Sequence, residues 1–450
     1  MHQAEGSRLP LRYAVAVFVG NGLEFYDFMT YAFFAVYIGR TFFPSGDPML
    51  SLLASLGTFG VGFFTRPLGA LYFGPLADRI GRRPVMVASF TLMGFGIAGL
   101  CLTPSYKQIG VAAPILVLVF RLIQGFALGG EVGPSTAYMV EAAPPMRRGL
   151  YGAMQACTVD VSNAIAGIVG LVLSLCLSQQ QLQDWGWRAA MGLGVLIVPF
   201  GLWMRSRLPE SLPAAADARP DSSSGRVAVP FMRSIRPHMR VMVLGLIVIS
   251  SLTIGGYTAN YMGTYSMTAL HWSSTVAFSV VIATNAVSAI CDATGGWLSD
   301  HCGRKPATLV PMSLLMVSIL PAFWAIGHYH SLTALYSASI LMTILFALSS
   351  GAIFTTITEQ LPAHLRSGGM ATIYAFAVSI FGGTTQFMET WLIRATGSPL
   401  APAYYWLCAA ALGFLAFSML PESAPIRQGG LDSGRRESLP LAPGTKHAHR

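Results

Sequence analysis

The chain has 450 residues, of which 53% are hydrophobic and only 10% are charged, and its mean hydropathy is +0.57. A soluble protein of this length carries roughly a quarter charged residues, so the composition excludes an ordinary soluble protein and indicates a chain that lies mostly in lipid. The formal net charge of +9 raises the alternative of a nucleic-acid-binding protein, which the distribution of the basic residues then decides.

Twelve apolar segments are long enough to cross a bilayer, which takes about 20 residues. Because backbone polar groups in hydrocarbon must bond within their own segment, these runs predict helices. The expected fold class is therefore an all-α membrane protein with twelve transmembrane helices. The segments cover residues 13–38, 53–77, 85–104, 111–137, 150–177, 188–206, 239–265, 274–298, 307–327, 332–358, 370–395 and 400–420.

Carboxyl groups lie within several of these segments, where ionisable side chains are costly and mark candidate functional sites. Asn21, Glu24 and Asp27 share one side of the first helix because they are spaced three residues apart. A buried carboxyl beside an arginine can take up and release a proton, although it can equally form an ion pair that holds the helices together. The predicted proton-coupling carboxyls are Glu24, Asp27, Glu131 and Asp292; Asp160 has no assigned role.

Arg66 and Arg121 lie in the second and fourth segments. A guanidinium group matches a carboxylate with two parallel hydrogen bonds, so both are candidate ligands of an acidic substrate. The alternative is an ion pair within the bundle, for example between Arg121 and Glu24. Arg188, near the outer end of the sixth segment, can bind either substrate or lipid headgroups.

Polar side chains of the second half can offer hydroxyl and amide groups to the same substrate, or simply bond neighbouring helices, and the sequence leaves both open. Glu389 lies three residues after one of them, Gln386, on the same helix face. The predicted substrate-binding residues are Arg66, Arg121, Arg188, Gln124, Tyr257, Tyr261, Asn285 and Gln386. By contrast, Gly125 and Gly129 are predicted to be packing positions, because small residues at this spacing let helices approach closely.

Motifs of the first half recur in the second in the same order. Residues 74–84 (GPLADRIGRRP) match residues 296–306 (GWLSDHCGRKP), and Leu-Pro-Glu-Ser occurs at 208–211 and again at 420–423. Two related bundles around a central site are a common plan of transporters. We therefore expect two pseudo-symmetric six-helix bundles at 1–206 and 239–421, a cytoplasmic linker at 207–238 and a cytoplasmic tail at 422–450.

The repeated loop predicts a gate. An aspartate ends one helix, a glycine allows a tight turn and a proline suits the first turn of the next helix, while the loop charges can bind across the interface between the bundles in one conformation and release in another. The predicted gating residues are Asp78, Arg79, Gly81, Arg82, Arg83, Glu141, Arg148, Asp300, Gly303, Arg304, Lys305, Glu359 and Arg366.

Lysine and arginine residues gather in alternate connections between the segments. One side of the predicted membrane carries most of them, and the other has little beyond Arg40, Lys107 and Arg394. By the positive-inside rule, this asymmetry predicts a multi-pass protein of the cell inner membrane with both termini in the cytoplasm. The basic excess is thus a topology signal, so we expect the lipid bilayer as a partner and no nucleic acid.

The sequence resembles the major facilitator superfamily, whose signature is the loop at 74–84. Within it the chain is similar to the metabolite:proton symporters, on residues 20–28 (GNGLEFYDF), 66–69 (RPLG), 121–125 (RLIQG), 129–133 (GGEVG), 147–149 (RRG) and 185–188 (WGWR). A closer resemblance, to citrate and tricarballylate carriers, depends on residues 361–366 (LPAHLR) and 380–386 (IFGGTTQ).

This resemblance implies proton-coupled import of a small organic acid, a citrate-like di- or tricarboxylate, by alternating access in a monomeric unit. The alternative within the fold is a symporter of a zwitterion or monocarboxylate such as proline, betaine, shikimate or oxoglutarate. An exporter and a membrane sensor that binds a solute without moving it are rival hypotheses. No catalytic array, nucleotide motif or metal-spaced set of cysteines and histidines occurs, so we expect no enzymatic activity, no metal and no cofactor besides the coupled proton.

Overall fold

In a computed structural model of the protein, the described residues are 22, 25–80, 82–129, 145–206, 236–362 and 366–426, and over these the chain forms helices and no strand. Four predicted site residues, Glu24, Gly81, Glu131 and Glu141, lie outside the described residues. The side chains of Asp78, Arg79, Arg82 and Arg83 are also not described.

The first part of the chain is helical over 25–33 and then forms a series of helices that follow the predicted segments. They are α2 (Ala35–Phe42), α3 (Pro48–Phe64), α4 (Arg66–Ile80), α5 (Arg82–Leu102), α6 (Tyr106–Ile109), α7 (Ala112–Leu128), η1 (Pro145–Arg147), α9 (Arg148–Cys176), α10 (Gln179–Gln181), η2 (Leu182–Gly186) and α11 (Trp187–Ser206).

The second part repeats this pattern of long antiparallel helices. Its elements are η3 (Arg236–His238), α13 (Met239–Thr268), α14 (Ser274–Cys302), α15 (Arg304–Tyr329), α16 (Leu332–Ser350), α17 (Ile353–Gln360), α18 (Arg366–Ala377), η5 (Val378–Gly382), α19 (Gly383–Thr396) and α20 (Ala401–Ser418). Each predicted segment from 53–77 onward overlaps at least one of the described helices, and seven helices of the described part are long and apolar enough to cross a membrane.

Local sequence explains where several helices begin and end. The Asp47 side chain accepts a hydrogen bond from the Met49 backbone at 2.9 Å, and Pro48 occupies the first turn of α3. Ser331 caps α16 in the same way, accepting from Ala334 at 3.1 Å. Gly397 ends α19 in the left-handed conformation, with φ of 65°.

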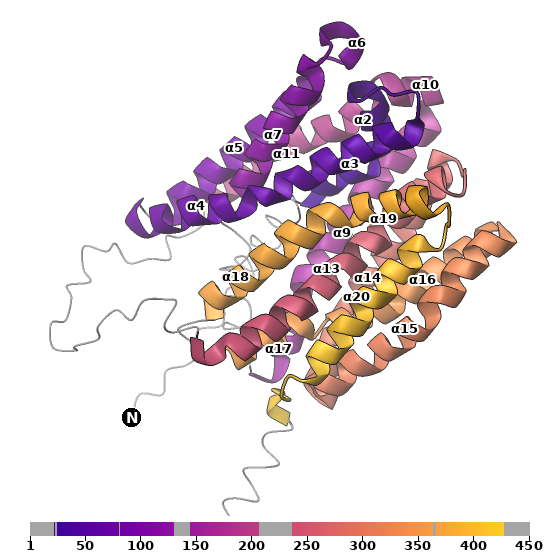
Figure 1. Ribbon diagram of the computed structural model, residues 1–450. Helices are drawn as coiled ribbons and strands as arrows, with labels where there is room; N and C mark the ends of the chain where they lie inside the picture. The colour runs from indigo at the N-terminus through magenta and orange to yellow at the C-terminus, as the bar shows by residue number, and fades with distance from the viewer. Residues whose placement is uncertain are drawn as a thin grey trace, which may run out of the picture.

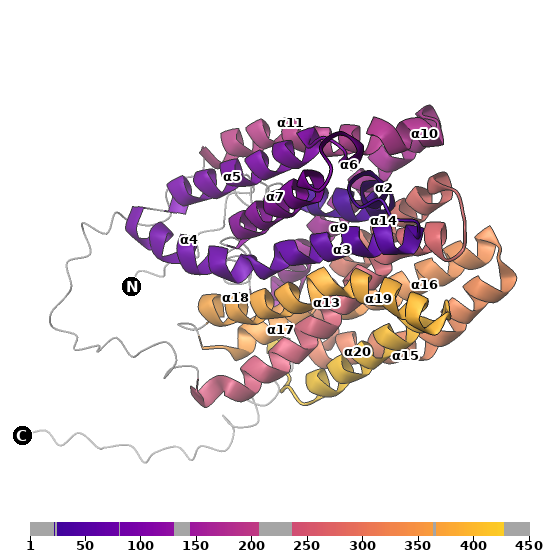
Figure 2. The same ribbon diagram turned by 45° about the horizontal axis from the view of Figure 1, so that its top comes forward.

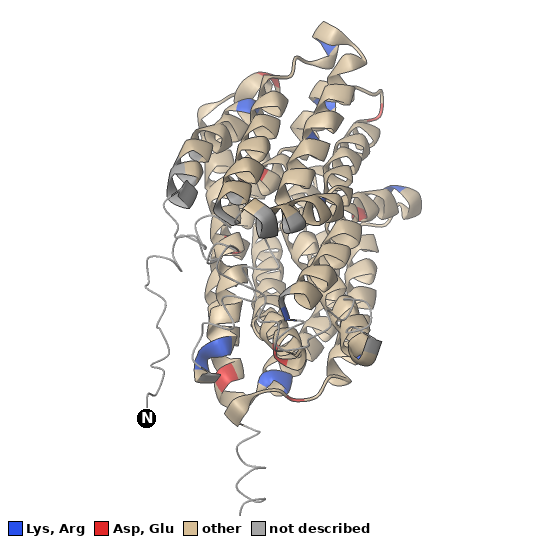
Figure 3. Ribbon diagram, turned by 90° about the vertical axis from the view of Figure 1, so that its left-hand side faces the viewer, with Lys and Arg blue, Asp and Glu red and all other residues tan. Residues whose placement is uncertain are grey.

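The helices form two groups that meet along a few helix pairs. The first group consists of the helices up to α11 and the second of α13 to α20. Helices α4, α5, α7 and α11 lie on one side and the second group on the other (Figures 1 and 2). The main contacts between the groups are α3 with α19 and α9 with α14. Figure 3 shows that long stretches of these helices carry no charge and that many of the charged residues lie toward the ends of the molecule.

Candidate functional site

Arg121 is held inside the first group of helices with most of its hydrogen-bonding capacity unused. It is 0% exposed, and α7 is brought against α3 because Gly125 packs on the backbone of Gly62, where a Cβ would lie 1.6 Å from the carbonyl oxygen. The Arg121 Nη1 donates to Gln124 Oε1 at 2.6 Å, whereas its Nε and Nη2 have no hydrogen-bond partner among the described residues. Such a group is ready to bind an acceptor that the protein itself does not provide.

Asp27 is the nearest carboxylate to Arg121 among the described residues. Its Oδ2 lies 3.9 Å from Arg121 Nη1, which is too long for a hydrogen bond, and neither carboxyl oxygen has a hydrogen-bond partner within the described part of the chain. Asp27 is 1% exposed. The two charges therefore face each other in a buried site without the bonds that would make a closed ion pair.

Aromatic rings surround two of the three predicted substrate arginines, Arg121 and Arg66. The Arg121 Cζ lies 3.7 Å from the ring centroid of Tyr31 and 5.1 Å from that of Phe28. The Arg66 Cζ faces the same Phe28 ring at 4.7 Å, and Phe63 at 4.2 Å. Such cation–π contacts stabilise a guanidinium while leaving its N–H edge available. We refer to Phe28, Tyr31, Phe59 and Phe63 as the aromatic box.

The second group of helices reaches the aromatic box through Tyr257 of α13. Its ring centroid lies 5.9 Å from that of Phe63 and 6.3 Å from that of Phe59. The structure thus brings together Arg66, Arg121, Gln124 and Tyr257 from the residues predicted to bind substrate. The box itself was missed by sequence reasoning, although Phe28 and Tyr31 follow Asp27 and lie three residues apart on the helix, which could have indicated it.

Other predicted substrate residues have protein partners. The Tyr261 hydroxyl lies 2.8 Å from the Thr390 hydroxyl, and Asn285 donates to Asn260 at 3.1 Å. Gln386 is 1% exposed and its Oε1 has no hydrogen-bond partner. The first two therefore connect helices within the second group, while Gln386 retains a free acceptor.

Arg188 lies elsewhere. Its Nη2 donates to the carbonyl of Thr103 at 2.7 Å and its Nε to the carbonyl of Cys101 at 3.2 Å, so it closes the carboxyl end of α5. The guanidinium also stacks on Trp187 at 4.2 Å. Substrate binding by Arg188 stays a prediction, and this geometry favours a structural role.

Asp292 and Asp160 face each other from α14 and α9, within hydrogen-bonding reach. Asp292 is 2% exposed and accepts a hydrogen bond from Ser350 of α16, and Ser288 contacts Asp160. Asp160, which had no assigned role, is therefore the partner of one predicted proton-coupling residue.

At one end of the molecule, Arg304 forms a closed network. It is 0% exposed and donates to Asp300 at 2.6 Å, to Ser299 at 2.8 Å and to Glu359 through Nε and Nη2 at 3.3 and 3.2 Å. Gly303 turns the chain between α14 and α15 with φ of 103°, a conformation that favours glycine. The predicted tight turn at Gly303 is confirmed.

This network joins the two groups of helices. Asp300 accepts hydrogen bonds from the backbone of Gly149 at 2.8 Å and Leu150 at 3.0 Å, both at the start of α9. Thr355 donates to the carbonyl of Arg148 at 3.1 Å. This close contact depends on the missing side chain of Gly149, because a Cβ there would lie 2.4 Å from Arg304 Nη1.

Two other predicted gating residues are not in the ion network. Lys305 Nζ donates to the carbonyl of Ser418 at 2.8 Å, and Arg366 Nε to the carbonyl of Leu361 at 3.0 Å. Glu422, which was not predicted, does bond to residues of the repeated loop. Its carboxylate accepts hydrogen bonds from the backbone N–H groups of Arg304 and Lys305 at 2.9 and 3.0 Å. The repeated Leu-Pro-Glu-Ser motif could have indicated it.

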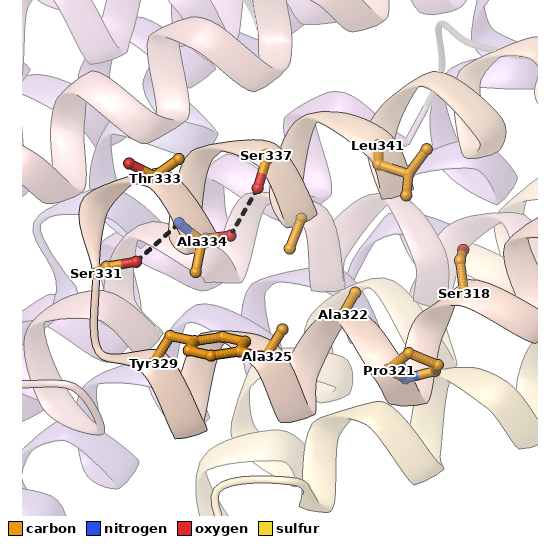
Figure 4. Close-up of a pocket in the computed structure, with 11 residues that line it drawn as sticks. Ser318, Pro321, Ala322, Ala325, Tyr329, Ser331, Thr333, Ala334, Ser337 and Leu341 are labelled. Atoms are coloured by element: carbon orange, nitrogen blue, oxygen red, sulfur yellow. Dashed lines mark hydrogen bonds between the residues drawn. The ribbon is translucent and has the colours of Figure 1, made fainter.

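A groove between α15 and α16 is distinct from this site (Figure 4). Alanine, serine, threonine, proline, leucine and tyrosine side chains line it, with no charged side chain among them. None of the residues predicted to bind substrate belongs to it.

Comparison with known proteins identifies the fold that carries these arginines. The family model of the Major Facilitator Superfamily matches residues 17–385. The chain belongs to this superfamily. Its fold is accordingly the twelve-helix fold of major facilitator transporters, and the predicted fold class is confirmed.

Named members of the superfamily are similar to nearly the whole chain. The citrate-proton symporter of Klebsiella pneumoniae is 32% identical over 398 residues, covering 88% of each chain. The proline/betaine transporter of Escherichia coli (strain K12) is 28% identical over 433 residues, covering 92% of this chain and 84% of that one. A solved structure of a D-xylose-proton symporter covers 93% of this chain and 99% of its own, with a TM-score of 0.72 at 16% identity, and this likeness shows the fold alone.

Proposed function

We propose that this membrane transporter imports a small organic acid, a citrate-like di- or tricarboxylate, together with protons. The observation that carries the proposal is the buried Arg121, whose Nε and Nη2 lack partners while Arg66 faces the same Phe28 ring. Two guanidinium groups at one place suit a substrate with more than one carboxylate. The similarity to the citrate-proton symporter of Klebsiella pneumoniae supports the same substrate class.

Asp27 is the proposed link between proton and substrate. At 3.9 Å from Arg121 it competes with a substrate carboxylate for the same guanidinium. A proton on Asp27 removes this competition and leaves Arg121 to the substrate, and loss of the proton restores it. Proton and acid thereby bind together and leave together. Glu24, Glu131 and Asp292 remain further predicted proton-coupling positions.

An energetic argument supports coupling to protons. Each negative charge that enters a cell against a potential of 100 mV costs about 2.3 kcal/mol, so a trianion faces about 7 kcal/mol. Protons carried with the acid neutralise this charge and add the energy of the pH gradient.

The remaining parts of the proposal concern topology and gating. The Arg304 network is proposed to be the cytoplasmic gate, closed by the bonds of Asp300 to Gly149 and Leu150, between bundles at 1–206 and 239–421. The membrane is proposed to be the cell inner membrane, with the linker, the tail and both termini in the cytoplasm.

A zwitterion is the second candidate substrate. The aromatic box favours it, because a quaternary ammonium binds well to aromatic faces while its carboxylate binds Arg121. The similarity to the proline/betaine transporter supports this alternative.

The experiment is uptake of labelled citrate, tricarballylate, proline and betaine into proteoliposomes with an imposed pH gradient. We expect tricarboxylate uptake that an uncoupler abolishes. Uptake that is indifferent to the uncoupler would reject proton coupling, and uptake of betaine alone would favour the second candidate.

A further inference from the structure

Glu389 of α19 is a buried carboxyl group that belongs to neither the aromatic box nor the Arg304 network. It is 0% exposed. Its Oε1 lies 2.5 Å from the Thr258 hydroxyl of α13, and its Oε2 has no hydrogen-bond partner. An ionisable group with an unused buried oxygen inside a transmembrane helix is a candidate for function.

No cation balances this carboxyl. Within the described part of the chain, none of the ion pairs includes Glu389. The titratable side chains that face it are Tyr261 of α13 and Tyr405 of α20, and α3, on another side of α19, has no ionisable residue. Burying an isolated carboxylate is so costly that such a group takes the neutral form instead.

The hydrogen bonds of Thr258 favour a protonated Glu389. The Thr258 Oγ1 lies 2.8 Å from the carbonyl oxygen of Ile254 as well as 2.5 Å from Glu389 Oε1. A hydroxyl has a single hydrogen and cannot donate to both oxygens. A protonated Glu389 provides the missing hydrogen by donating to Thr258, which then donates to Ile254.

Glu389 lies on α19, a helix at the interface between the two groups of helices. On its other side, α19 packs against α3, where a Cβ on Gly383 would lie 2.5 Å from the carbonyl oxygen of Gly60 and Phe387 lies beside Gly57. The π-helical turn η5 immediately precedes α19, and such turns are frequent at functional sites. Glu389 thus bonds α19 to α13, and α19 also contacts α3 of the other group of helices.

We propose, on the basis of the proposed function, that Glu389 is a second proton-binding site of the transport cycle. Protonated, it fastens α19 to α13 through Thr258. When the proton leaves, the carboxylate loses this donor bond to Thr258 and becomes an uncompensated buried charge, so α19 must move until water or another donor reaches it. The proton therefore controls how α19 docks between α13 and α3.

The test compares the wild type with Glu389→Gln in proteoliposomes at zero membrane potential and a gradient of about one pH unit. We expect citrate counterflow exchange to be retained in the variant. Net accumulation should fall about tenfold, because one coupled proton is worth about 1.36 kcal/mol per pH unit. Asp184→Asn, which removes an exposed carboxyl, is the matched control and should accumulate citrate as the wild type does.

An infrared difference spectrum of the same proteins reads the proton directly. A carbonyl band from the protonated Glu389 carboxyl, besides any band of Asp27, should be present in the wild type and in Asp184→Asn and missing in Glu389→Gln. Thr258→Val, which keeps the acid and removes its partner, should shift the band.

The outcomes separate the two proposals. An unchanged accumulation ratio or an unchanged infrared band in Glu389→Gln overturns the assignment of Glu389. A wild-type protein that accumulates no acid under a pH gradient overturns the proposed function instead, and the infrared band still reports whether Glu389 holds a proton.

Discussion

Arg121 and Arg304 are both completely buried arginines next to carboxylates, yet their surroundings differ. Arg304 donates to Ser299, Asp300 and Glu359. Arg121 donates to Gln124, lies 3.9 Å from Asp27 and has two nitrogens without partners. A satisfied buried ion network holds a structure in one arrangement, whereas an unsatisfied one has bonds left for a ligand.

From this difference we propose a stabilising role for Arg304 and a binding role for Arg121. Replacing Arg304 leaves two carboxylates without their partner in a buried contact between the halves. Replacing Arg121 removes a cation that faces aromatic rings, donates to a neutral amide and lies 3.9 Å from Asp27 without a hydrogen bond to it. Each prediction below tests whether the two roles can be separated.

The largest expected effect is on stability. Arg304→Met should destabilise the protein by about 3–5 kcal/mol, because breaking a buried ion pair leaves uncompensated charge. Thermal unfolding in detergent measures the loss. Lys305→Met is the matched control, since Lys305 bonds only the Ser418 carbonyl through its side chain and should cost much less. Equal losses in the two variants would break the comparison.

Replacing Arg121 should lower the affinity for substrate. Arg121→Lys retains the charge but loses the planar fork, which should cost about 1.5–3 kcal/mol of substrate interaction, or about 10- to 100-fold in apparent affinity. The concentration dependence of citrate uptake measures it. An unchanged KM would show that the free nitrogens of Arg121 do not contact the substrate.

A smaller, pH-dependent effect is expected at Glu422, beside the Arg304 network. Burial raises the pKa of Glu422, but the backbone N–H groups of Lys305, Ala424, Arg304 and Ser423 outweigh it, and the pKa lies below its usual 4.5. A lowered folded-state pKa contributes stability above the unfolded value that is lost as the pH falls through the folded one.

Glu422→Gln should therefore lower stability by about 0.3–1 kcal/mol at neutral pH. Its difference from the wild type should shrink as the pH falls below 4.5. Melting temperatures at neutral and acidic pH measure this, and a difference that grows on acidification would contradict the assignment.

The smallest effect should come from the exposed pair of Arg394 and Asp47, which are 3.0 Å apart and 44% and 43% exposed. Surface ion pairs contribute about 0.2–1 kcal/mol. Arg394→Ala should thus change the melting temperature slightly and leave citrate uptake intact. A loss as large as that of Arg304→Met would show that burial does not distinguish these arginines.

The sequence is a good guide to the helices because lipid imposes one strong condition, a long apolar run, that can be read locally. The predicted segment 239–265 becomes Met239–Thr268 and 274–298 becomes Ser274–Cys302. The close packing expected at Gly125 is present as well. The turn at Gly303 was predictable because a glycine in a short loop between two helices indicates a backbone conformation, here a positive φ, that favours glycine.

The partners of the buried polar groups were harder to predict, since they lie far apart in the sequence. Nothing near Arg188 indicates that it closes α5 through the Thr103 carbonyl. For Arg121 the sequence left both Glu24 and Asp27 open as ion-pair partners; the structure brings Asp27 to it, and Glu24 lies outside the described residues. The aromatic box depends on how the helix at 25–33 packs against α3, which a hydrophobic pattern does not encode. Assignments of substrate-binding, proton-coupling and gating residues stay predictions.

The most direct test of the central claim is calorimetric titration of citrate into the purified wild type, Arg121→Met and Arg394→Ala. Our account predicts the same affinity for the wild type and Arg394→Ala and a loss of at least about tenfold in Arg121→Met. Citrate binding of wild-type affinity to Arg121→Met would contradict it.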